Sequence, residues 1–193
     1  PADVDDVHEI MDRVGVRRPV IAKIEKPQAV ENLEDIVRAF DGIMVARGDL
    51  GVELPLEQVP LVQKRAISLA RKRSKPVIVA TQVFDSMIDN PRPTRAEASD
   101  CANAVMDGAD AVMLSGETSV GKFPIECVET MSSIIEYAEE HGMEQIPLIG
   151  NLHRTRNGVI TRAAMEISEA LGVKHLVVFT ESGQTARREA RLR

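Results

Sequence analysis

Ile43-Met44-Val45-Ala46-Arg47-Gly48-Asp49-Leu50-Gly51 is the stretch of sequence that decides the fold. An apolar run stops there on an arginine, two glycines and a carboxylate, which predicts a buried strand that ends at a functional turn. Glycine lets the backbone approach a ligand closely. We therefore expect Asp49 to face a ligand while neighbouring amides stay free to bind an anion.

Three other apolar runs in the chain end in the same way. Residues 19–25 (PVIAKIE) carry Lys23 and Glu25, residues 77–81 (VIVAT) end on Thr81, and residues 111–114 lead into Ser115-Gly116-Glu117. Continuous apolar strands of this kind are typical of a parallel sheet with both faces covered.

Helical patterns separate the predicted strands. Apolar residues at helical spacing predict helices at residues 3–14, 29–40, after Pro55, after a Thr94–Glu97 capping box, and at 124–140. Strands joined by helices with polar residues at their carboxyl ends predict the later half of a (β/α)8 barrel, in four βα units. Four strands cannot close a barrel, and their unpaired edges are a liability, so we expect this chain to be part of a larger protein.

The composition excludes several classes of function. A net charge of -6 argues against a broad nucleic-acid surface. The chain has no apolar run of about 18 residues, which argues against a membrane span. Its acidic, amphipathic beginning does not resemble a signal peptide, and a cytoplasmic location is expected. Cys101 and Cys127 stand among small and apolar residues of predicted helices, so buried free thiols are expected.

The pattern changes after Gly142, which predicts a domain boundary. We expect a partial catalytic barrel at 1–143, a linker at 144–152 and the start of a second α/β domain at 153–193. That domain is predicted to hold a helix around 159–167, a strand at 176–179, and a polar loop before a basic helix.

The strand ends are predicted to converge on one pocket. Side chains alternate along a strand, so the members of three pairs should share a side: Lys23 with Glu25, Arg47 with Asp49, and Ser115 with Glu117. Glu25 and Asp49 suit Mg²⁺ or Mn²⁺, which take few carboxylates plus water and substrate oxygens. Lys23 between them could stabilise a phosphoryl group or an enolate.

Five segments together resemble the pyruvate kinase family over essentially the whole chain, from the later half of its barrel to the opening of its C-terminal domain. They are AKIEKPQAVENLEDI (22–36), DGIMVARGDLGVELP (41–55), KPVIVATQ (75–82), NPRPTRAE (90–97) and AVMLSGETSVGKFP (111–124). The resemblance implies phosphoryl transfer from phosphoenolpyruvate to ADP, giving pyruvate and ATP.

The resemblance also implies roles for single residues. Lys23 is the catalytic lysine, Glu25 and Asp49 are the metal ligands, and Thr81 binds the substrate carboxylate and takes part in enolate protonation. The backbone of Ala46, Arg47, Gly48 and Asp49 holds that carboxylate, and Ser115 and Glu117 belong to the proton-relay side. Thr180, Ser182, Gly183 and Thr185 resemble a loop that binds the phosphate of an allosteric effector.

The resemblance further implies a homotetramer that uses Mg²⁺ or Mn²⁺. It allows for K⁺ as well, whose ligands in the family lie outside this chain, as do the substrate-binding arginine and most nucleotide contacts. The isolated 193 residues are therefore expected to be inactive.

Two other hypotheses stay open on the residues. A metal-dependent lyase or aldolase acting on pyruvate enolates could share the Glu/Asp pair, although it would not need Lys23 or the TRAE and SGET segments. A coupled assay of ATP formation from ADP on the full-length protein separates this hypothesis from pyruvate kinase activity. The second alternative is non-catalytic: a truncated chain that only packs with partners, or a half barrel prone to misfolding. A purified chain that is monomeric, cooperatively folded and active alone would refute it.

Overall fold

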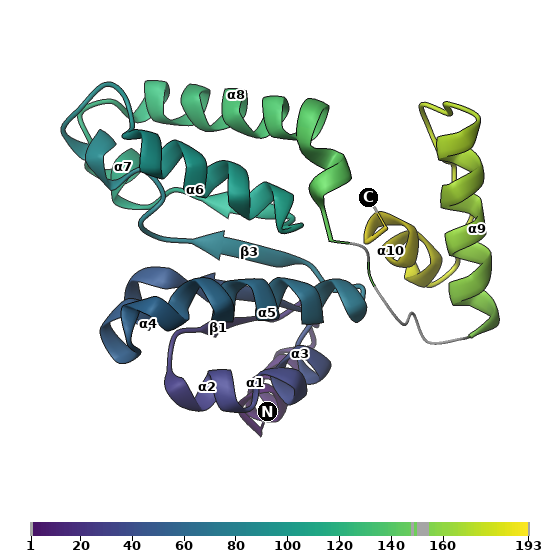
Figure 1. The fold of residues 1–193 in the computed structure, drawn as a ribbon. Helices are drawn as coiled ribbons and strands as arrows, with labels where there is room; N and C mark the ends of the chain where they lie inside the picture. The colour runs from purple at the N-terminus through teal and green to yellow at the C-terminus, as the bar shows by residue number, and fades with distance from the viewer. Residues whose placement is uncertain (1, 148, 150–154, 193) are drawn as a thin grey trace.

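A computed structural model describes residues 2–147, 149 and 155–192 (Figure 1). Its centre is a four-stranded sheet in the order β1-β2-β3-β4, with every neighbouring pair parallel. Sequential order and parallel pairing are what successive units of a (β/α)8 barrel require, so the predicted fold class is confirmed. The strands are β1 (Ile21–Ile24), β2 (Gly42–Ala46), β3 (Val77–Ala80) and β4 (Ala111–Met113).

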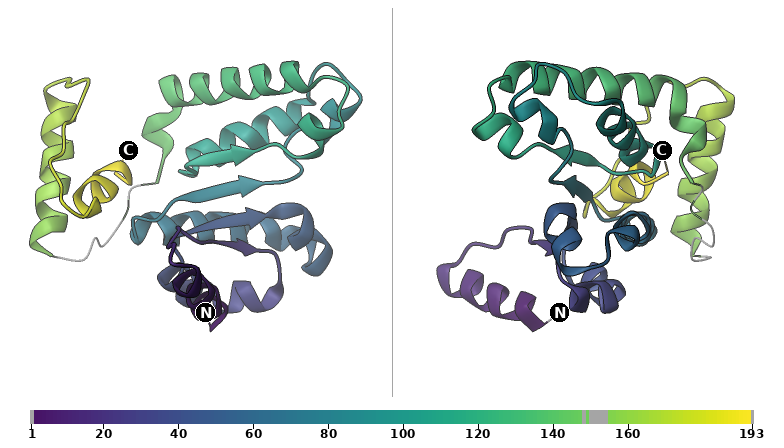
Figure 2. Two further views of the ribbon diagram at one scale, coloured as in Figure 1. Left: turned by 180° about the vertical axis from the view of Figure 1, so that it is seen from behind. Right: turned by 60° about the vertical axis from the view of Figure 1, so that its left-hand side comes forward.

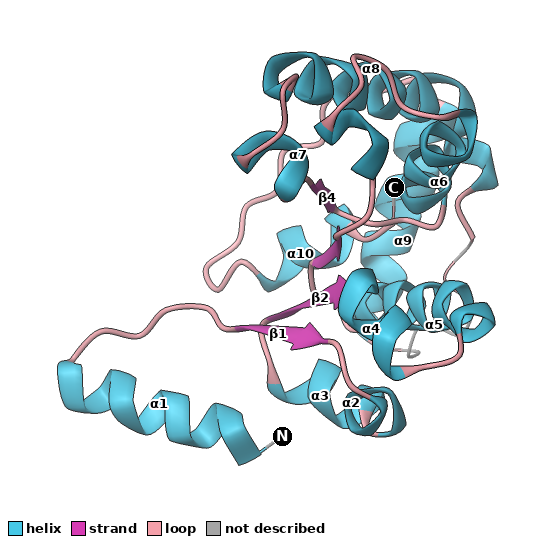
Figure 3. Ribbon diagram, turned by 90° about the vertical axis from the view of Figure 1, so that its left-hand side faces the viewer, coloured by secondary structure: helices cyan, strands magenta, loops and turns pink. Residues whose placement is uncertain are grey.

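Helices connect the strands and run on after the last one. Those of the sheet-containing part are α1 (Ala2–Val14), α2 (Pro27–Glu31), α3 (Leu33–Ala39), α4 (Arg47–Glu53), α5 (Val59–Lys72), α6 (Arg95–Met106), α7 (Gly116–Ser119) and α8 (Pro124–Gly142), with short 3-10 turns η1 (Leu56–Gln58), η2 (Asp85–Ile88) and η3 (Met143–Gln145). In Figure 3, α4, α5 and α6 lie to the right of the strands and α1 lies to their left.

The two faces of the sheet differ in burial. One row of paired residues, Ala22, Ile43 and Val77, is at most 8% exposed and packs in the main apolar core. In the neighbouring row Lys23 is exposed, and its partners Met44 and Ile78 are only half-buried. The buried row faces the helices, so the open row marks the face that the interior of a barrel would occupy.

The helix predicted at 29–40 is two helices, α2 and α3, that meet at Asn32. Its side-chain amide donates to the carbonyl of Gln28 at 2.8 Å. Asparagine competes in this way with the helical hydrogen-bond ladder, which explains the break.

The stretch from Arg47 to Gly51 was predicted as a turn and is instead the first part of helix α4. Leu50 is completely buried in the main core and Asp49 lies in the first helical turn, where a carboxylate is favourable. Burial of one apolar side chain thus outweighs the two glycines, which by propensity favour a turn.

The second part of the chain holds α9 (Arg156–Ala170) and α10 (Gln184–Ala190), which pack on each other (Figure 2). The predicted strand at 176–179 is wrong. Those residues are irregular, and Val177 and Phe179 are 75% and 94% exposed. A strand needs a neighbour for its backbone groups, and the described residues contain no strand outside β1–β4.

Part of the predicted 144–152 linker lies outside the described residues. Within it, the structure describes the end of η3 and residues 146, 147 and 149. No helix in the described ranges is long and apolar enough to cross a membrane.

The predicted capping box at the start of α6 is confirmed. The Thr94 amide donates to Glu97 Oε2 at 2.7 Å, and the Glu97 amide donates to Thr94 Oγ1 at 3.2 Å. Glu97 also accepts from the amide and the hydroxyl of Ser86, which fastens η2 to the helix start. Burial raises the pKa of Glu97, but the hydrogen bonds that its carboxylate accepts from the amides and hydroxyls of Ser86 and Thr94 outweigh this and leave the pKa below its usual range.

Glu97→Gln should lower the free energy of unfolding at neutral pH by about 1 kcal/mol, the usual worth of a cap. A carboxyl whose pKa is depressed by folding stabilises above the unfolded pKa and loses that contribution as pH falls through the folded value. Urea unfolding against pH should therefore show the two proteins converging below about pH 4. Glu57→Gln, at an exposed carboxylate, is the control; a difference that persists at low pH would contradict this account.

Candidate active site

The carboxyl ends of the four strands meet at one edge of the sheet. Ile24 pairs with Val45, Ala46 with Ala80, and Ala80 with Met113, so the residues that follow each strand are neighbours. This is the edge at which parallel barrels carry their active sites.

Lys23 joins two carboxylates from different segments. Its Nζ lies 2.5 Å from Glu25 Oε2 and 2.9 Å from Asp49 Oδ2. The predicted convergence of these three residues is thus present in the structure. The hydrogen bond to Glu25, and then that to Asp49, raises the pKa of Lys23 above its usual value. The ammonium therefore stays protonated throughout the neutral range.

Glu25 and Asp49 have the donor chemistry for a hard divalent cation. Both carboxylates already reach one positive group, the Lys23 ammonium, so their oxygens converge. The described residues hold no group of three or more His, Cys, Asp or Glu side chains suited to a metal. Two carboxylates with the other positions left to water and substrate oxygens fit Mg²⁺, which keeps several waters.

Thr81 and Gly48 link the ends of β3 and β2. The amide of Gly48 donates to Thr81 Oγ1 at 2.8 Å, and that hydroxyl donates to the carbonyl of Ala80 at 2.7 Å. The sequence predicted free amides in this stretch, and for Gly48 the structure corrects this. A Cβ at position 48 would lie 3.2 Å from Thr81 Oγ1, so the missing side chain permits the close approach.

The side chain of Arg47 does not share a side with Asp49. Alternation predicted that it would, but helix α4 begins at Arg47, so strand periodicity ends there. Arg47 is 8% exposed and donates to the carbonyls of Thr81 and Gln82 and to Asp100. It is thus held inside the protein, while Asp49 reaches Lys23.

Glu117 is 1% exposed and holds two loops together. Its carboxylate accepts from the Phe84 amide at 3.1 Å and the Ser115 amide at 2.7 Å. Ser115 precedes helix α7 and Glu117 lies within it, so strand alternation does not apply to this pair either. Both residues lie at the end of β4, while the contacts of Glu117 are to the backbone and not to Lys23.

Three polar residues near these strand ends were not predicted from the sequence. Gln63 and Asp100 contact Arg47 from α5 and α6. Burial raises the pKa of Asp85, and the nearby carboxylates of Glu117 and Glu97 raise it further. No local pattern marks these residues, because each lies on a helix or turn distant in sequence from the strand end that it approaches.

The loop before α10 is ordered locally. The Gly183 amide donates to Thr180 Oγ1 at 3.1 Å, and Gly183 has a φ of 75°, which a glycine adopts without strain. Thr180 and Ser182 are exposed, and Thr185 lies in the first turn of the helix.

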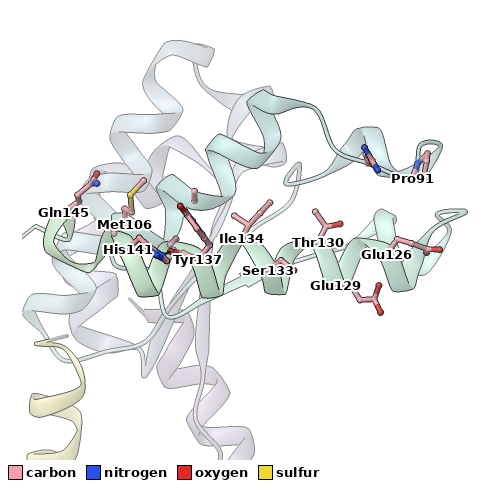
Figure 4. Close-up of a pocket in the computed structure, with 14 residues that line it drawn as sticks. Pro91, Met106, Glu126, Glu129, Thr130, Ser133, Ile134, Tyr137, His141 and Gln145 are labelled. Atoms are coloured by element: carbon pink, nitrogen blue, oxygen red, sulfur yellow. Dashed lines mark hydrogen bonds between the residues drawn. The ribbon is translucent and has the colours of Figure 1, made fainter. Parts of the chain in front are cut away.

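A groove of about 820 Å³ runs along α6 and α8, away from the strand ends (Figure 4). Met106, Ile134 and Tyr137 line it, and none of the predicted site residues does. The rings of Tyr137 and His141 stack there, with centroids 4.2 Å apart. It is a feature of the outer helical layer and not of the candidate active site.

Cys101 and Cys127 are free thiols, each at most 1% exposed, as predicted. Burial raises the pKa of each to about 11. Thiols that stay protonated at neutral pH are poor nucleophiles, so neither is a catalytic candidate.

Comparisons with known proteins agree with this architecture. The family model for the pyruvate kinase barrel domain matches residues 1–128. The chain is 67% identical over 192 residues to a pyruvate kinase of Mycobacterium tuberculosis, 68% to one of Mycobacterium intracellulare and 65% to one of Corynebacterium glutamicum. Each alignment covers 100% of this chain and 40% of the relative, so the chain spans two fifths of the length of the curated relatives it matches.

Glu25→Gln and Asp49→Asn should each weaken Mn²⁺ binding by about tenfold or more, because even outer partners of metal ligands are worth 10- to 100-fold. The affinity can be measured on a protein that contains this chain and is as long as the relatives, by following the electron paramagnetic resonance signal of free Mn²⁺. Glu31→Gln, at an exposed carboxylate at the end of α2, should bind Mn²⁺ normally. Unchanged affinity in both site variants would remove these residues from the metal site.

Proposed function

The chain belongs to the pyruvate kinase family, and from this premise we propose that it supplies the later half of the catalytic barrel of an enzyme that transfers a phosphoryl group from phosphoenolpyruvate to ADP. The observation that carries the proposal is the contact of the Lys23 ammonium with Glu25 and Asp49 at the carboxyl ends of β1 and β2. Phosphoryl transfer depends on such positioned charges more than on covalent chemistry.

Lys23 stabilises the negative charge that develops on the transferring phosphoryl group and on the enolate. A fixed cation aimed at developing charge is among the largest contributions that a site can make. The raised pKa of Lys23, caused first by Glu25 and then by Asp49, supports this role because the side chain stays charged.

Glu25 and Asp49 hold a divalent cation, Mg²⁺ or Mn²⁺. When bound, the cation supplies charge neutralisation for the phosphoryl oxygens. The two carboxylates orient Lys23 as well, since each lies within 3 Å of its Nζ. The same pair therefore controls the position of both positive groups.

Thr81 binds the substrate carboxylate together with the backbone of Ala46, Arg47, Gly48 and Asp49, and it helps to protonate the enolate. The hydroxyl of Thr81 and the amide of Gly48 lie 2.8 Å apart at the ends of β3 and β2, so the two groups are placed next to each other. The substrate carboxylate would replace the contacts that they make with each other and with the Ala80 carbonyl. Ser115 and Glu117 serve the proton-relay side. Their support is their position after β4, where the Glu117 carboxylate accepts from the amides of Ser115 and Phe84.

The remaining expectations concern the whole protein. We retain three segments, a barrel part at 1–143, a linker at 144–152 and the start of a regulatory domain at 153–193, and the family match to residues 1–128 falls within the first. Three expectations stay predictions from the family resemblance: a homotetramer, a cytoplasmic location, and a phosphorylated effector at Thr180, Ser182, Gly183 and Thr185. The resemblance also allows for K⁺, with ligands outside this chain.

Lys23→Met should abolish nearly all turnover in a protein of the relatives' length while leaving its unfolding transition in place. Loss of one electrostatic group of this kind costs at least about a hundredfold in kcat. The measurement is ATP formation from phosphoenolpyruvate and ADP in a coupled assay. Lys72→Met, at an exposed lysine of α5, is the matched control.

Substantial turnover by Lys23→Met would refute the role given to Lys23. Absence of ATP formation in the unmodified protein, together with cleavage of a pyruvate-enolate substrate, would favour the lyase or aldolase hypothesis instead.

A further inference from the structure

The guanidinium of Arg47 uses all of its hydrogen-bonding capacity inside the protein. Nε and Nη2 lie 3.3 and 3.1 Å from the carbonyl oxygen of Thr81, Nη2 lies 2.9 Å from that of Gln82, and Nη1 donates to Gln63 Oε1 at 3.4 Å and to Asp100. An arginine has five N–H donors in a planar fork. Five hydrogen bonds therefore leave none for a substrate.

The two carbonyls that Arg47 binds belong to residues in an unfavourable backbone conformation. Thr81 has a φ of 65° and Gln82 a φ of 52°, and neither is a glycine. Residues of this kind persist in the left-handed region only when surrounding contacts hold them there. The fork of Arg47 supplies such contacts to both residues at once.

The same backbone conformation directs the hydroxyl of Thr81. Oγ1 accepts from the Gly48 amide at 2.8 Å and donates to the Ala80 carbonyl at 2.7 Å. Gly48 follows Arg47 directly in α4, so one helix start binds Thr81 twice, through the Arg47 side chain and through the Gly48 backbone. The position of the hydroxyl is thereby tied to the position of the guanidinium.

Asp100 fixes the guanidinium from the far side. Its carboxylate, on helix α6, is 42% exposed, while the Arg47 side chain is 9% exposed. Gln63 of α5 contacts Arg47 as well and donates to Asp107 at 3.3 Å. The anchor is thus built from two helices of the outer layer.

We propose that Arg47 is a positioning residue whose side chain holds Thr81 and Gln82 in their left-handed conformation and so aims the Thr81 hydroxyl, with Asp100 as its anchor. This goes beyond the backbone contact expected of Arg47, and its kinetic consequence rests on the proposed function, in which Thr81 binds the phosphoenolpyruvate carboxylate. A lysine cannot replace the fork, because it is a point charge with three donors.

A double-mutant cycle in a protein of the relatives' length tests this proposal. Arg47→Met and Thr81→Ala should each lower kcat/KM for phosphoenolpyruvate by up to about a hundredfold, since a misplacement of about 1 Å can cost that much. The kcat/KM of the double variant should be no more than about twofold below that of the single variant with the lower kcat/KM, because both changes remove the same contribution, that of the correctly placed Thr81 hydroxyl. Arg47→Lys should resemble Arg47→Met, and Arg65→Met, at an exposed arginine of α5, should be normal.

The readout that separates positioning from general structure is the KM for each substrate. The KM for phosphoenolpyruvate should rise while that for ADP stays within about twofold, because Thr81 serves only the former. Losses that multiply in the double variant, or an unchanged KM for phosphoenolpyruvate in Arg47→Met, would overturn the proposal.

Two further arms cover failure of the first. If Arg47→Met does not fold, Asp100→Asn is tested in its place. Asp100→Asn should raise the KM for phosphoenolpyruvate less than Arg47→Met would, and it should cause no further rise when Thr81→Ala is also present. A further rise in the presence of Thr81→Ala would contradict the proposal. If the unmodified protein forms no ATP, the proposed function fails by itself. A crystal structure of Arg47→Lys then decides, because a Thr81 that keeps its positive φ and its contact with Gly48 would refute the positioning role.

Discussion

Parallel alignment of β1 to β4 is the constraint on which the rest of the structure depends. It gathers the carboxyl ends of four strands at one edge of the sheet. The contacts of Lys23, of Arg47 and of Glu117 all form at this edge. The row of Ala22, Ile43 and Val77 fixes the register by burying one face against the helices. A slip of one residue would bury Lys23 instead, at a large cost for an uncompensated charge.

The ends of the strands divide into two electrostatic regions. On the open side, Lys23, Glu25 and Asp49 are each at least 32% exposed and can exchange partners with a substrate or cation. Arg47 and Glu117, in contrast, are nearly buried, and their side chains bind backbone groups of neighbouring loops. Backbone partners of this kind hold the loops in place, while the exposed group is left free for chemistry.

Sequence reasoning succeeded where periodicity and strand ends decide the outcome. It predicted four parallel strands from the alternation of apolar runs and helical patterns, and the Thr94–Glu97 cap from a local motif. It predicted the meeting of Lys23 with Glu25 and Asp49 from their places at the ends of neighbouring strands. It failed where a distant contact outweighs local preference.

Contacts between residues distant in sequence account for both failures, in one by their presence and in the other by their absence from the described residues. Burial of Leu50 makes a helix of the glycine-containing stretch after Ala46, and this turns Arg47 away from Asp49. The predicted strand at 176–179 has no partner among the described strands. Crystals of a protein of the relatives' length, grown with Mn²⁺, provide the most direct test of the central claim, that the strand ends form one cation-binding site beside Lys23. The account predicts an anomalous peak between the carboxylates of Glu25 and Asp49, and a peak that avoids both residues would contradict it.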